Sequence, residues 1–389
     1  MKIIFVSDAV YPYFVGGREK RLYEISKRLV EYGHEVHIFT MKWWKGASAK
    51  IENGVVLHGV CKLKSIYTEK ERRRSLWQAF YFGIKVFFPL LREKFDIFDA
   101  DQIPYFHLIF CKIVCLLKRK KLIVTWHEVW GKEKWFDYLG KFKGFFSYWI
   151  EKLAVKMPDR IIAVSDTTAE RLRKILKIKK EKIIVIPNGI NIEEINKAPR
   201  ANLKSDCIFA GRLIKHKNVD YLIKAIKIIK QKYKPNIKCI IIGDGPEKEE
   251  LKKQTKNLDL ENNIKFLGFL GNQLDVFSYF KTSQVFVSPS TNEGFGITVL
   301  EANACGLPAV VINHPDNATR DLIIENKNGY VVNLNINEIA EKIIDILKNI
   351  ELWNERIGNH AIILKKYSWD NLAKNILSIY QSINNLELS

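Results

Sequence analysis

The chain has 389 residues, of which 47% are hydrophobic and 27% are charged. This length exceeds one ordinary hydrophobic core, so two or three domains are expected, and the composition excludes a largely disordered chain. The net charge of +20 is concentrated in residues 1–200, which carry 39 Lys and Arg against 22 Asp and Glu. Such an excess favours an anionic partner: a phosphorylated substrate, a nucleic acid or an anionic membrane surface. The alternative is a merely solubilising surface.

The cysteines and the apolar runs indicate the expected cellular location of the protein. The six cysteines have neither C-x-x-C spacing nor a histidine at metal-ligand spacing, so reduced thiols and a cytoplasmic location are expected. The apolar run at the N-terminus ends at Asp8, too early for a signal peptide. The two longest apolar runs are interrupted by Lys85 and Lys112, so no transmembrane helix is expected.

In chain order, the hydrophobic pattern predicts a parallel α/β protein. A short apolar strand at 2–7, a glycine-containing loop, an amphipathic helix at 18–32 and a strand at 35–40 form a β–loop–α–β opening. The same alternation continues through the first half of the chain. Further strands are predicted at 96–100, 121–125, 160–164 and 182–186, and further helices at 105–117, 145–156 and 167–175.

A second α/β series follows a break in this pattern. The alternation lapses between 191 and 205, where Pro199 interrupts it, and we place the link between two domains there. Strands are then predicted at 207–210, 238–242, 264–267, 285–288 and 309–311, with helices at 218–232, 246–256, 272–279, 296–304, 337–347 and 370–384. Two open α/β domains in tandem predict a ligand crevice between them, at the carboxyl ends of their strands.

The most informative segment is a strand end, a glycine-containing turn and a helix start. Gly294 and Gly296 allow a ligand to approach the backbone, and the unpaired amides of a helix N-terminus bind phosphate well. Glu293 and Glu301 are eight residues apart, roughly 12 Å of helix rise, which is too far for the paired carboxyls of a glycoside hydrolase. They could bind two parts of an extended ligand. The alternative is that Glu293 is only a charge near a helix N-cap and that Glu301 is only a solvated helix residue.

Three other groups of residues stand at predicted strand ends. Arg212 and Lys217 could neutralise a diphosphate, and the alternative is a solvated basic loop. His127 could hydrogen-bond a sugar hydroxyl or stabilise charge, although a lone histidine is more often structural. Gly16 and Gly17 lack the G-x-G-x-x-G spacing of a dinucleotide site but permit a tight loop.

Together these segments resemble glycosyltransferase family 4, the retaining enzymes of the GT-B fold. The matching pieces occur in the family's order and span about the whole chain: Gly16-Gly17-Arg18-Glu19, His127, Ile186-Pro187-Asn188-Gly189-Ile190, Gly211-Arg212-Leu213 with Lys217, Ile242-Gly243-Asp244-Gly245-Pro246, and Glu293 with Glu301. One stretch departs from the family. After Val311 many members have a Gly-Gly pair and then a Glu, whereas this chain continues Asn313-His314-Pro315-Asp316. Detailed donor specificity is therefore not carried over.

The resemblance implies an α/β protein of GT-B fold. It has two tandem Rossmann-like domains that face a central cleft, and a C-terminal helix that crosses back to the first domain. The implied domains are an acceptor-binding domain at 1–200, a nucleotide-sugar-binding domain at 201–368 and the returning helix at 369–389.

The resemblance also implies a role for each matched residue. The donor diphosphate would be bound by Gly16, Gly17, Arg212, Lys217, Gly294, Phe295 and Gly296. Glu301 would bind the ribose, while His127 and Glu293 would be the catalytic residues at the transferred sugar. No metal is implied, and no Asp-x-Asp is evident between the predicted strands. Retention of configuration implies attack on the front face, with a donor phosphate oxygen taking the proton of the acceptor.

The predicted function is retaining transfer of a sugar from a UDP- or GDP-linked donor to a hydroxyl of a glycan or lipid-linked acceptor, in cell-envelope glycan or glycolipid synthesis, with no cofactor. Basic residues beside aromatic ones at 71–82, 118–121 and 126–149 predict peripheral contact with an anionic membrane, on the inner face of the cell membrane. The alternatives are an epimerase-like enzyme of the same fold and a nucleic-acid-binding protein. No RNP, KH or zinc-finger signature is present, so no nucleic acid is expected.

Overall fold

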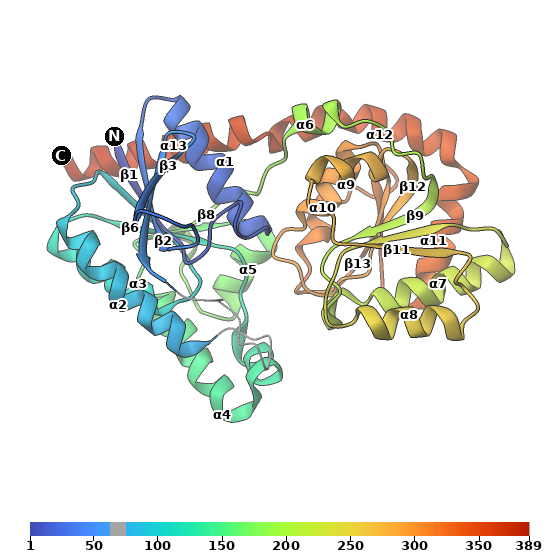
Figure 1. The fold of residues 1–389 in the computed structure, drawn as a ribbon, viewed down its shortest axis with the longest axis horizontal. Helices are drawn as coiled ribbons and strands as arrows, with labels where there is room; N and C mark the ends of the chain where they lie inside the picture. The colour runs from blue at the N-terminus through green and yellow to red at the C-terminus, as the bar shows by residue number, and fades with distance from the viewer. Residues whose placement is uncertain (63–74, 389) are drawn as a thin grey trace. The chain divides into compact units, whose positions relative to one another are not determined.

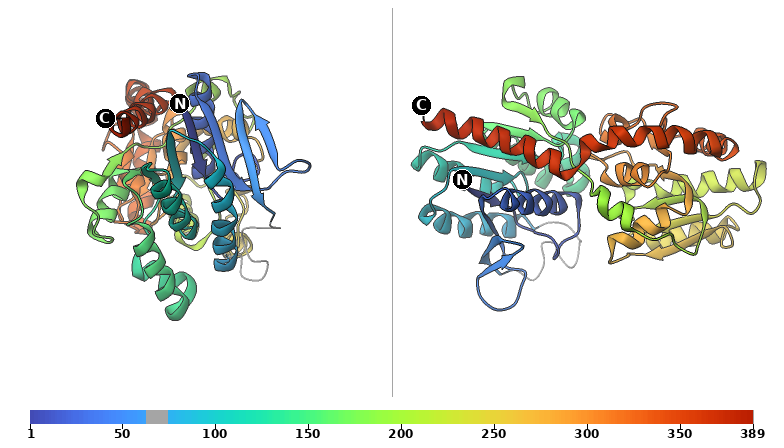
Figure 2. Two further views of the ribbon diagram at one scale, coloured as in Figure 1. Left: turned by 90° about the vertical axis from the view of Figure 1, so that its left-hand side faces the viewer. Right: turned by 90° about the horizontal axis from the view of Figure 1, so that it is seen from above.

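The computed structural model describes residues 1–62 and 75–388, which form two compact units (Figure 1; Figure 2). The first unit comprises Met1–Asn188 together with Trp369–Ser389, and the second comprises Gly189–Ser368. The last helix therefore belongs to the first unit, as expected. The sequence pattern placed the boundary near residue 200, whereas the contacts place it near 188. The segment between these points contains a short helix, α6 (Ile192–Lys197), that belongs to the second unit.

The first unit is built on an eight-stranded sheet in the order β3-β4-β2-β1-β5-β6-β7-β8. Neighbouring strands are parallel except for β3 and β4, which form an antiparallel pair at one edge. The strands are β1 Lys2–Val6, β2 Glu35–Met41, β3 Ala49–Glu52, β4 Val55–Cys61, β5 Ile97–Asp101, β6 Leu122–Trp126, β7 Arg160–Ala163 and β8 Ile183–Val185. Because β1, β5 and β6 are parallel neighbours, their carboxyl ends lie at one edge of the sheet.

Helices cover both faces of this sheet (Figure 1). One face is packed by α2 (Leu76–Arg92) and α3 (Phe106–Leu117), and the other by α1 (Gly17–Glu31) and α13 (Trp369–Leu388). The remaining helical segments of this unit are α4 (Gly131–Ala154), α5 (Asp166–Lys174) and the 3-10 turn η1 (Lys180–Lys182). Among the described residues, no helix combines the length and apolar character needed to cross a bilayer.

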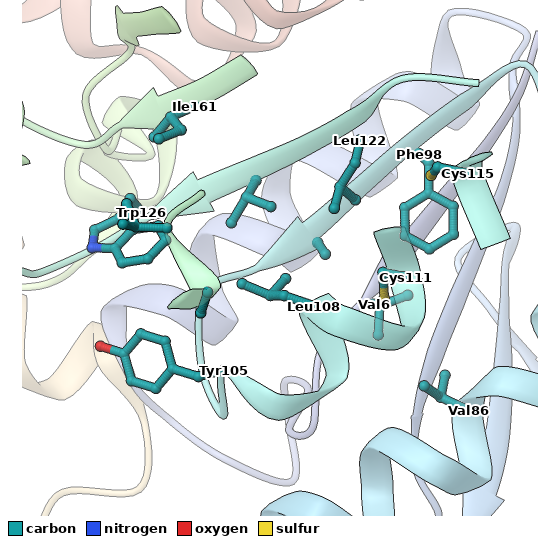
Figure 3. Packing of buried hydrophobic residues seen from close by; sticks show 14 of the residues in the cluster. Val6, Val86, Phe98, Tyr105, Leu108, Cys111, Cys115, Leu122, Trp126 and Ile161 are labelled. Carbon is teal, nitrogen blue, oxygen red and sulfur yellow. The ribbon is translucent and has the colours of Figure 1, made fainter. Parts of the chain in front are cut away.

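The apolar core under α2 and α3 explains why the first sheet reads as continuous hydrophobic runs (Figure 3). Phe98 of β5 and Leu122 of β6 are fully buried against Leu108, Cys111 and other residues of α3. A parallel sheet that is covered on both faces needs apolar side chains in both directions. Cys61, Cys111 and Cys115 take part in this packing. All six cysteines of the chain are free thiols, and five of them are buried.

The second unit is built on a six-stranded parallel sheet in the order β11-β10-β9-β12-β13-β14. Its strands are β9 Ser205–Ala210, β10 Cys239–Ile242, β11 Ile264–Gly268, β12 Ser283–Ser288, β13 Ala309–Ile312 and β14 Gly329–Val332. Its other helical segments are η2 Lys215–Lys217, α7 Val219–Lys232, α8 Lys248–Asn257, α9 Gln273–Phe280, α10 Ile297–Ala304, η3 Ala318–Leu322, α11 Ile336–Lys348, α12 Ile350–Leu364 and η4 Lys365–Tyr367. The strand order reverses between β9 and β12. In open α/β sheets, ligands bind at the carboxyl ends of strands beside such a reversal.

Candidate active site

The reversal point of the second sheet brings together candidate residues from two strand ends. β9 and β12 pair in parallel. Arg212 and Lys217 follow β9, whereas Glu293 and Gly296 follow β12. The Nζ atom of Lys217 forms an ion pair with Oε1 of Glu293, and each side chain is only 17% exposed. Arg212 is exposed at the surface of the same loop.

Asn218 holds the loop after β9 against the loop after β12. Its backbone is left-handed, with φ 48° and ψ 40°, at the start of α7, a conformation that asparagine adopts more readily than most residues. Its Nδ2 donates to the carbonyl oxygen of Pro289 at 3.0 Å and to Oγ1 of Thr291 at 3.3 Å. The amide of Thr291 in turn donates to the carbonyl oxygen of His216 at 3.0 Å. These bonds fix the position of the neighbouring Lys217.

The Gly-Asp-Gly motif after β10 supports the same loop by close backbone contact. A Cβ atom on Gly243 would lie 1.8 Å from the carbonyl oxygen of Gly211, and one on Gly245 would lie 2.3 Å from that of Leu213. The amide of Leu213 donates to the carbonyl oxygen of Asp244 at 2.9 Å. Only glycine fits at these two positions, because any side chain would displace the loop that carries the basic residues.

The start of α10 has the geometry of an anion-binding helix N-terminus. Gly296 is the N-cap with φ 90° and ψ 54°, and a Cβ atom there would lie 2.3 Å from Cγ2 of Thr319. The segment before it is fixed by two backbone bonds. Glu293 donates from its amide to the carbonyl oxygen of Asp316 at 3.0 Å, and Ala318 donates back to Glu293 at 2.9 Å. Amides in the first turn of a helix have no partner within the helix and are available to phosphate.

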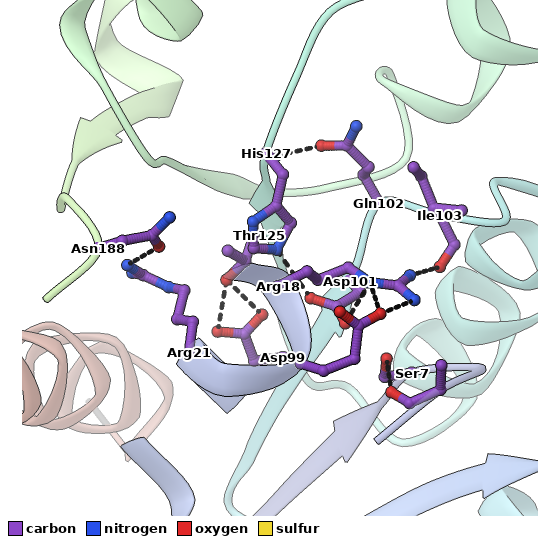
Figure 4. A network of polar contacts seen from close by, with 12 residues as sticks. Ser7, Arg18, Arg21, Asp99, Asp101, Gln102, Ile103, Thr125, His127 and Asn188 are labelled. Atoms are coloured by element: carbon purple, nitrogen blue, oxygen red, sulfur yellow. Dashed lines mark hydrogen bonds and ion pairs between the residues drawn. The ribbon is translucent and has the colours of Figure 1, made fainter. Parts of the chain in front are cut away.

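In the first unit, the carboxyl ends of β1, β5 and β6 surround a polar network (Figure 4). His127 follows β6, and its Nε2 lies 3.1 Å from Oδ1 of Asp101, the last residue of β5. The backbone amide of His127 donates to the side-chain oxygen of Gln102. Arg18 of α1 donates to Asp8 at 2.9 Å and lies 3.9 Å from Asp101. The network is largely buried, since the side chains of His127 and Asp101 are 12% and 8% exposed.

The charges of this network determine the state of Asp101. Burial alone would raise its pKa, but the hydrogen bond and the charge of His127, followed by the charge of Arg18, hold its pKa below the ordinary value. For Arg18, burial would lower the pKa, but Glu19, Asp8 and Asp101 raise it well above the ordinary value. Asp101 is therefore a carboxylate that accepts from His127 and fixes the orientation of the imidazole.

An Asp-x-Asp triplet, Asp99-Ala100-Asp101, forms the end of β5. It was overlooked in the sequence because it overlaps the strand predicted at 96–100. Its first member, Asp99, accepts hydrogen bonds from Oη of Tyr380 at 2.6 Å and from Oγ1 of Thr125 at 3.2 Å. Burial raises the pKa of Asp99 to about 6. Tyr380 lies on α13, so the returning helix is bonded to the strand that positions His127.

Two family models match consecutive parts of the chain. The model described as Glycosyltransferase Family 4 matches residues 15–194, and the model described as Glycosyl transferases group 1 matches residues 191–362. The chain belongs to glycosyltransferase family 4. It is a retaining glycosyltransferase that uses a nucleotide-sugar donor, and this assignment favours transfer over the epimerase-like alternative.

Relatives of known sequence or structure agree with this assignment. An uncharacterized glycosyltransferase of Methanocaldococcus jannaschii is 28% identical over 413 aligned positions, covering 98% of each chain. The alpha-monoglucosyldiacylglycerol synthase of Acholeplasma laidlawii is 30% identical over 234 positions, 56% of this chain and 58% of that protein.

Solved structures show the same fold. Sucrose-phosphate synthase from Thermosynechococcus elongatus superposes with a TM-score of 0.80 at 18% identity, covering 98% of each chain. The Anabaena HepE structure with UDP and glucose superposes with a TM-score of 0.75 at 20% identity, covering 98% of this chain and all of that one. The fold of the family 4 enzyme is GT-B, as the family resemblance implied.

The structure places the remaining predicted residues of the family 4 enzyme as follows. Gly16 is the N-cap of α1 and Gly17 its first residue, so both stand at the same sheet edge as the His127 network. Glu301 is 2% exposed on α10 and accepts a hydrogen bond from Nε2 of Gln273 at 3.2 Å. Its alternative reading as a solvated helix residue is therefore wrong.

Asn317 is a site residue that sequence analysis missed. It is fully buried, and its Nδ2 donates to the carbonyl oxygens of Ser290 at 2.9 Å and Ile312 at 2.8 Å. Its Oδ1 accepts from Oγ1 of Thr319 at 2.8 Å. Asn317 therefore joins the loop after β13 to the loop after β12, and its backbone forms a bridge with Glu293. The sequence did offer one signal, because asparagine is favoured at a helix N-cap and Asn317 is the N-cap of η3.

Proposed function

We propose that the second unit holds the diphosphate and nucleoside of the donor beside β9 and β12. Its proposed diphosphate-binding residues are Arg212, Lys217 and the amides of Gly294, Phe295 and Gly296, and the family resemblance adds Gly16 and Gly17 of the first unit. Glu301 would bind the ribose hydroxyls. The observation that carries this proposal is the ion pair between Lys217 and Glu293 at the reversal point of the sheet. A diphosphate would replace Glu293 as the partner of Lys217 and leave the carboxylate facing the sugar.

The chemistry follows from where charge develops. The bond between C1 of the sugar and the phosphate oxygen breaks, and its electron pair stays on the nucleoside diphosphate. The acceptor oxygen bonds to C1 on the same face, and its proton goes to a phosphate oxygen of the leaving group. Arg212, Lys217 and the amides at the start of α10 would stabilise the leaving diphosphate. His127, oriented by Asp101, would contact the sugar near C1.

An enzymatic assay tests this function. The purified protein is incubated with UDP-glucose, GDP-mannose and related donors, each with and without a membrane lipid extract, and release of nucleoside diphosphate is measured. One donor should give release that depends on the extract and is lost in Arg212→Ala/Lys217→Ala. Release from no donor, or release that is equal in the double variant, would contradict the proposal.

For the acceptor, we propose a lipid-linked molecule reached at an anionic membrane surface. α4 is kinked at Gly140, and beyond the kink it exposes large apolar side chains beside exposed lysines. These apolar residues are Phe142, Phe145, Phe146, Trp149 and Leu153. Phe142 is 78% exposed, and Nζ of Lys152 lies 4.9 Å from the ring of Trp149. Aromatic rings beside basic groups suit the membrane interface.

Not all of the predicted membrane segment has this character. Trp126 and Trp135, in its first half, are buried in the core, so their alternative reading as core aromatics is correct. Residues 71–74 of the predicted basic segment lie outside the described residues. The proposal therefore concerns the second half of α4. The name of the Acholeplasma laidlawii relative, a glucosyldiacylglycerol synthase, is consistent with a lipid acceptor.

Liposome flotation tests the membrane contact. Vesicles with and without anionic lipid are floated at low salt with the wild type, with Phe142→Ser/Phe146→Ser and with Phe269→Ser, a control at an exposed phenylalanine of the second unit. The wild type and the control should float with anionic vesicles, and the double variant should not. Absence of wild-type flotation, or equal flotation of all three, would contradict the proposal.

A further inference from the structure

Three side chains with metal-binding atoms meet on the α2 face of the first sheet. His37 lies on β2, His58 lies on β4, and Glu93 is the C-cap of α2. Each offers one ligand atom, and these atoms all lie within 4.8 Å of one another. The proposed donor and sugar residues do not include them. Their arrangement therefore needs an explanation apart from glycosyl transfer.

Hydrogen bonding sets which nitrogen of His37 faces the other histidine. Its Nε2 lies 2.8 Å from Oε1 of Glu35. A carboxylate only accepts, so Nε2 carries the hydrogen and Nδ1 of the neutral ring presents a lone pair. That Nδ1 lies 2.8 Å from Nε2 of His58. A histidine that donates to a carboxylate through one nitrogen and presents the other is the arrangement that orients metal-bound histidines in proteins.

The imidazole ring of His58 is held in a fixed orientation. Its ring stacks on that of Phe39, with centroids 4.4 Å apart and an interplanar angle of 8°, so the plane of the ring is fixed. The fixed ring presents Nε2 toward Nδ1 of His37.

Glu93 adds negative charge, and Lys2 competes for it. Nζ of Lys2 lies 3.1 Å from Oε2 of Glu93 and 2.9 Å from Oε1 of Glu35. Lys2 can keep its bond to Glu35 when Glu93 turns to another cation. Removal of the Lys2 ammonium should therefore strengthen cation binding at this cluster, whereas a cluster that exists only as ion pairs would gain nothing.

We propose that His37, His58 and Glu93 bind a divalent transition-metal ion of the zinc class. Two imidazole nitrogens and a carboxylate oxygen are ligands that zinc takes, with water as the fourth. Tetrahedral ligands at about 2.0–2.1 Å from the ion are roughly 3.3 Å apart, so the two histidine nitrogens need to separate by about 0.5 Å. The ion would join β2, β4 and the end of α2, which makes its role structural.

Cobalt, which reports tetrahedral binding by its visible absorption, is the probe. Chelator-treated, untagged full-length protein is titrated with Co²⁺ and then with Zn²⁺. One equivalent of Co²⁺ should give the tetrahedral spectrum, Zn²⁺ should displace it, and Zn²⁺ should raise the melting temperature. The proposal is overturned if the wild type gives no such spectrum.

Four variants locate the site. His58→Gln should lose the spectrum, whereas His34→Gln, a control at a partly buried histidine just before β2, should bind as the wild type does. Glu35→Gln, which neutralises the carboxylate that orients His37 and also pairs with Lys2, should weaken binding by about 10- to 100-fold. Lys2→Met should tighten it. Unchanged binding in both His58→Gln and Lys2→Met would overturn the proposal, and these readouts are independent of glycosyl transfer.

Discussion

His127 and Asp101 are joined across two neighbouring strands: Nε2 of the histidine lies 3.1 Å from Oδ1 of the aspartate. Arg18 stands on the other side of the carboxylate, at 3.9 Å. The histidine that the family's motif supplies is therefore not a lone side chain at a strand end. It is held by a buried carboxylate whose own charge is balanced by an arginine from α1.

We expect Asp101→Asn to lower kcat by about 100-fold, because a misplacement of about 1 Å at a reacting centre has an effect of that size. The KM for the donor should change little, since the residues proposed to hold the diphosphate are not altered. Steady-state kinetics with the identified donor measure both constants. Asp137→Asn, at an exposed aspartate on α4, is the control. A wild-type kcat in Asp101→Asn would show that the carboxylate does not position His127.

Lys217→Ala should weaken binding of the nucleoside diphosphate by about 10- to 100-fold, because a hydrogen bond to a charged group contributes about 1.5–3 kcal/mol. Isothermal titration with the free nucleotide measures the loss. Lys215→Ala is the matched control, since Lys215 is an exposed lysine on the same 3-10 turn. Equal losses in the two variants would indicate a general charge effect instead of a specific contact.

Glu293→Gln should separate binding from catalysis. The carboxylate is paired with Lys217 in the structure, and a bound phosphate would compete with it, so its neutralisation should leave nucleoside diphosphate binding unchanged or tighter. Turnover should fall, because Glu293 is proposed to face the transferred sugar. The same titration and the donor assay test both points. Weaker nucleotide binding together with normal turnover would contradict the assigned role.

Comparing Gly296→Ala with Gly306→Ala separates the effect of a steric clash from the cost of a positive φ. Both glycines have φ 90°, where a side chain costs about 1–2 kcal/mol. Nothing lies within 4 Å of a Cβ atom on Gly306, whereas one on Gly296 would lie 2.3 Å from the buried Thr319. Thermal unfolding should therefore show a larger loss for Gly296→Ala, which should also lose nucleotide binding. Equal losses with intact binding would contradict the proposed role of this turn.

Asp99 should make stability depend on pH. Burial raises its pKa from 3.8 to about 6, so between these values the folded state binds more protons than the unfolded one. The contribution of Asp99 to the free energy of unfolding therefore falls as the pH rises from 3.8 to about 6. The stability of Asp99→Asn relative to the wild type should accordingly increase by about 1 kcal/mol between pH 5 and pH 8. Denaturant unfolding at several pH values measures this, and a constant difference would contradict the raised pKa.

The sequence predicted the elements that carry most of the site, because buried parallel strands read as apolar runs that end at glycines or polar residues. β9, β12 and α10 were placed within two residues of their observed ends. The β3–β4 hairpin was missed, although Asn53 and Gly54, both with positive φ, form its two-residue turn. The first half of α4 was missed too, since Gly140 breaks the helical pattern.

The residues that position others could not be predicted, because their role depends on which strands are neighbours. Asp101 reaches His127 only because β5 lies beside β6, and Asn317 reaches Ser290 only because β13 lies beside β12. Lys217 and Glu293 were each proposed as site residues from local motifs. Their ion pair depends on the pairing of β9 with β12, which the chain order does not reveal.

The most direct test of the account is nucleotide binding to the wild type and to Arg212→Ala/Lys217→Ala. UDP, GDP and ADP are each titrated, and thermal stabilisation is recorded in parallel. Ligand at 100 times its Kd should stabilise the protein by about 2.7 kcal/mol. The account predicts that one nucleoside diphosphate binds the wild type and stabilises it, and that the double variant loses both effects. Equal binding by the two proteins, or no binding by the wild type, would contradict the placement of the donor diphosphate beside β9 and β12.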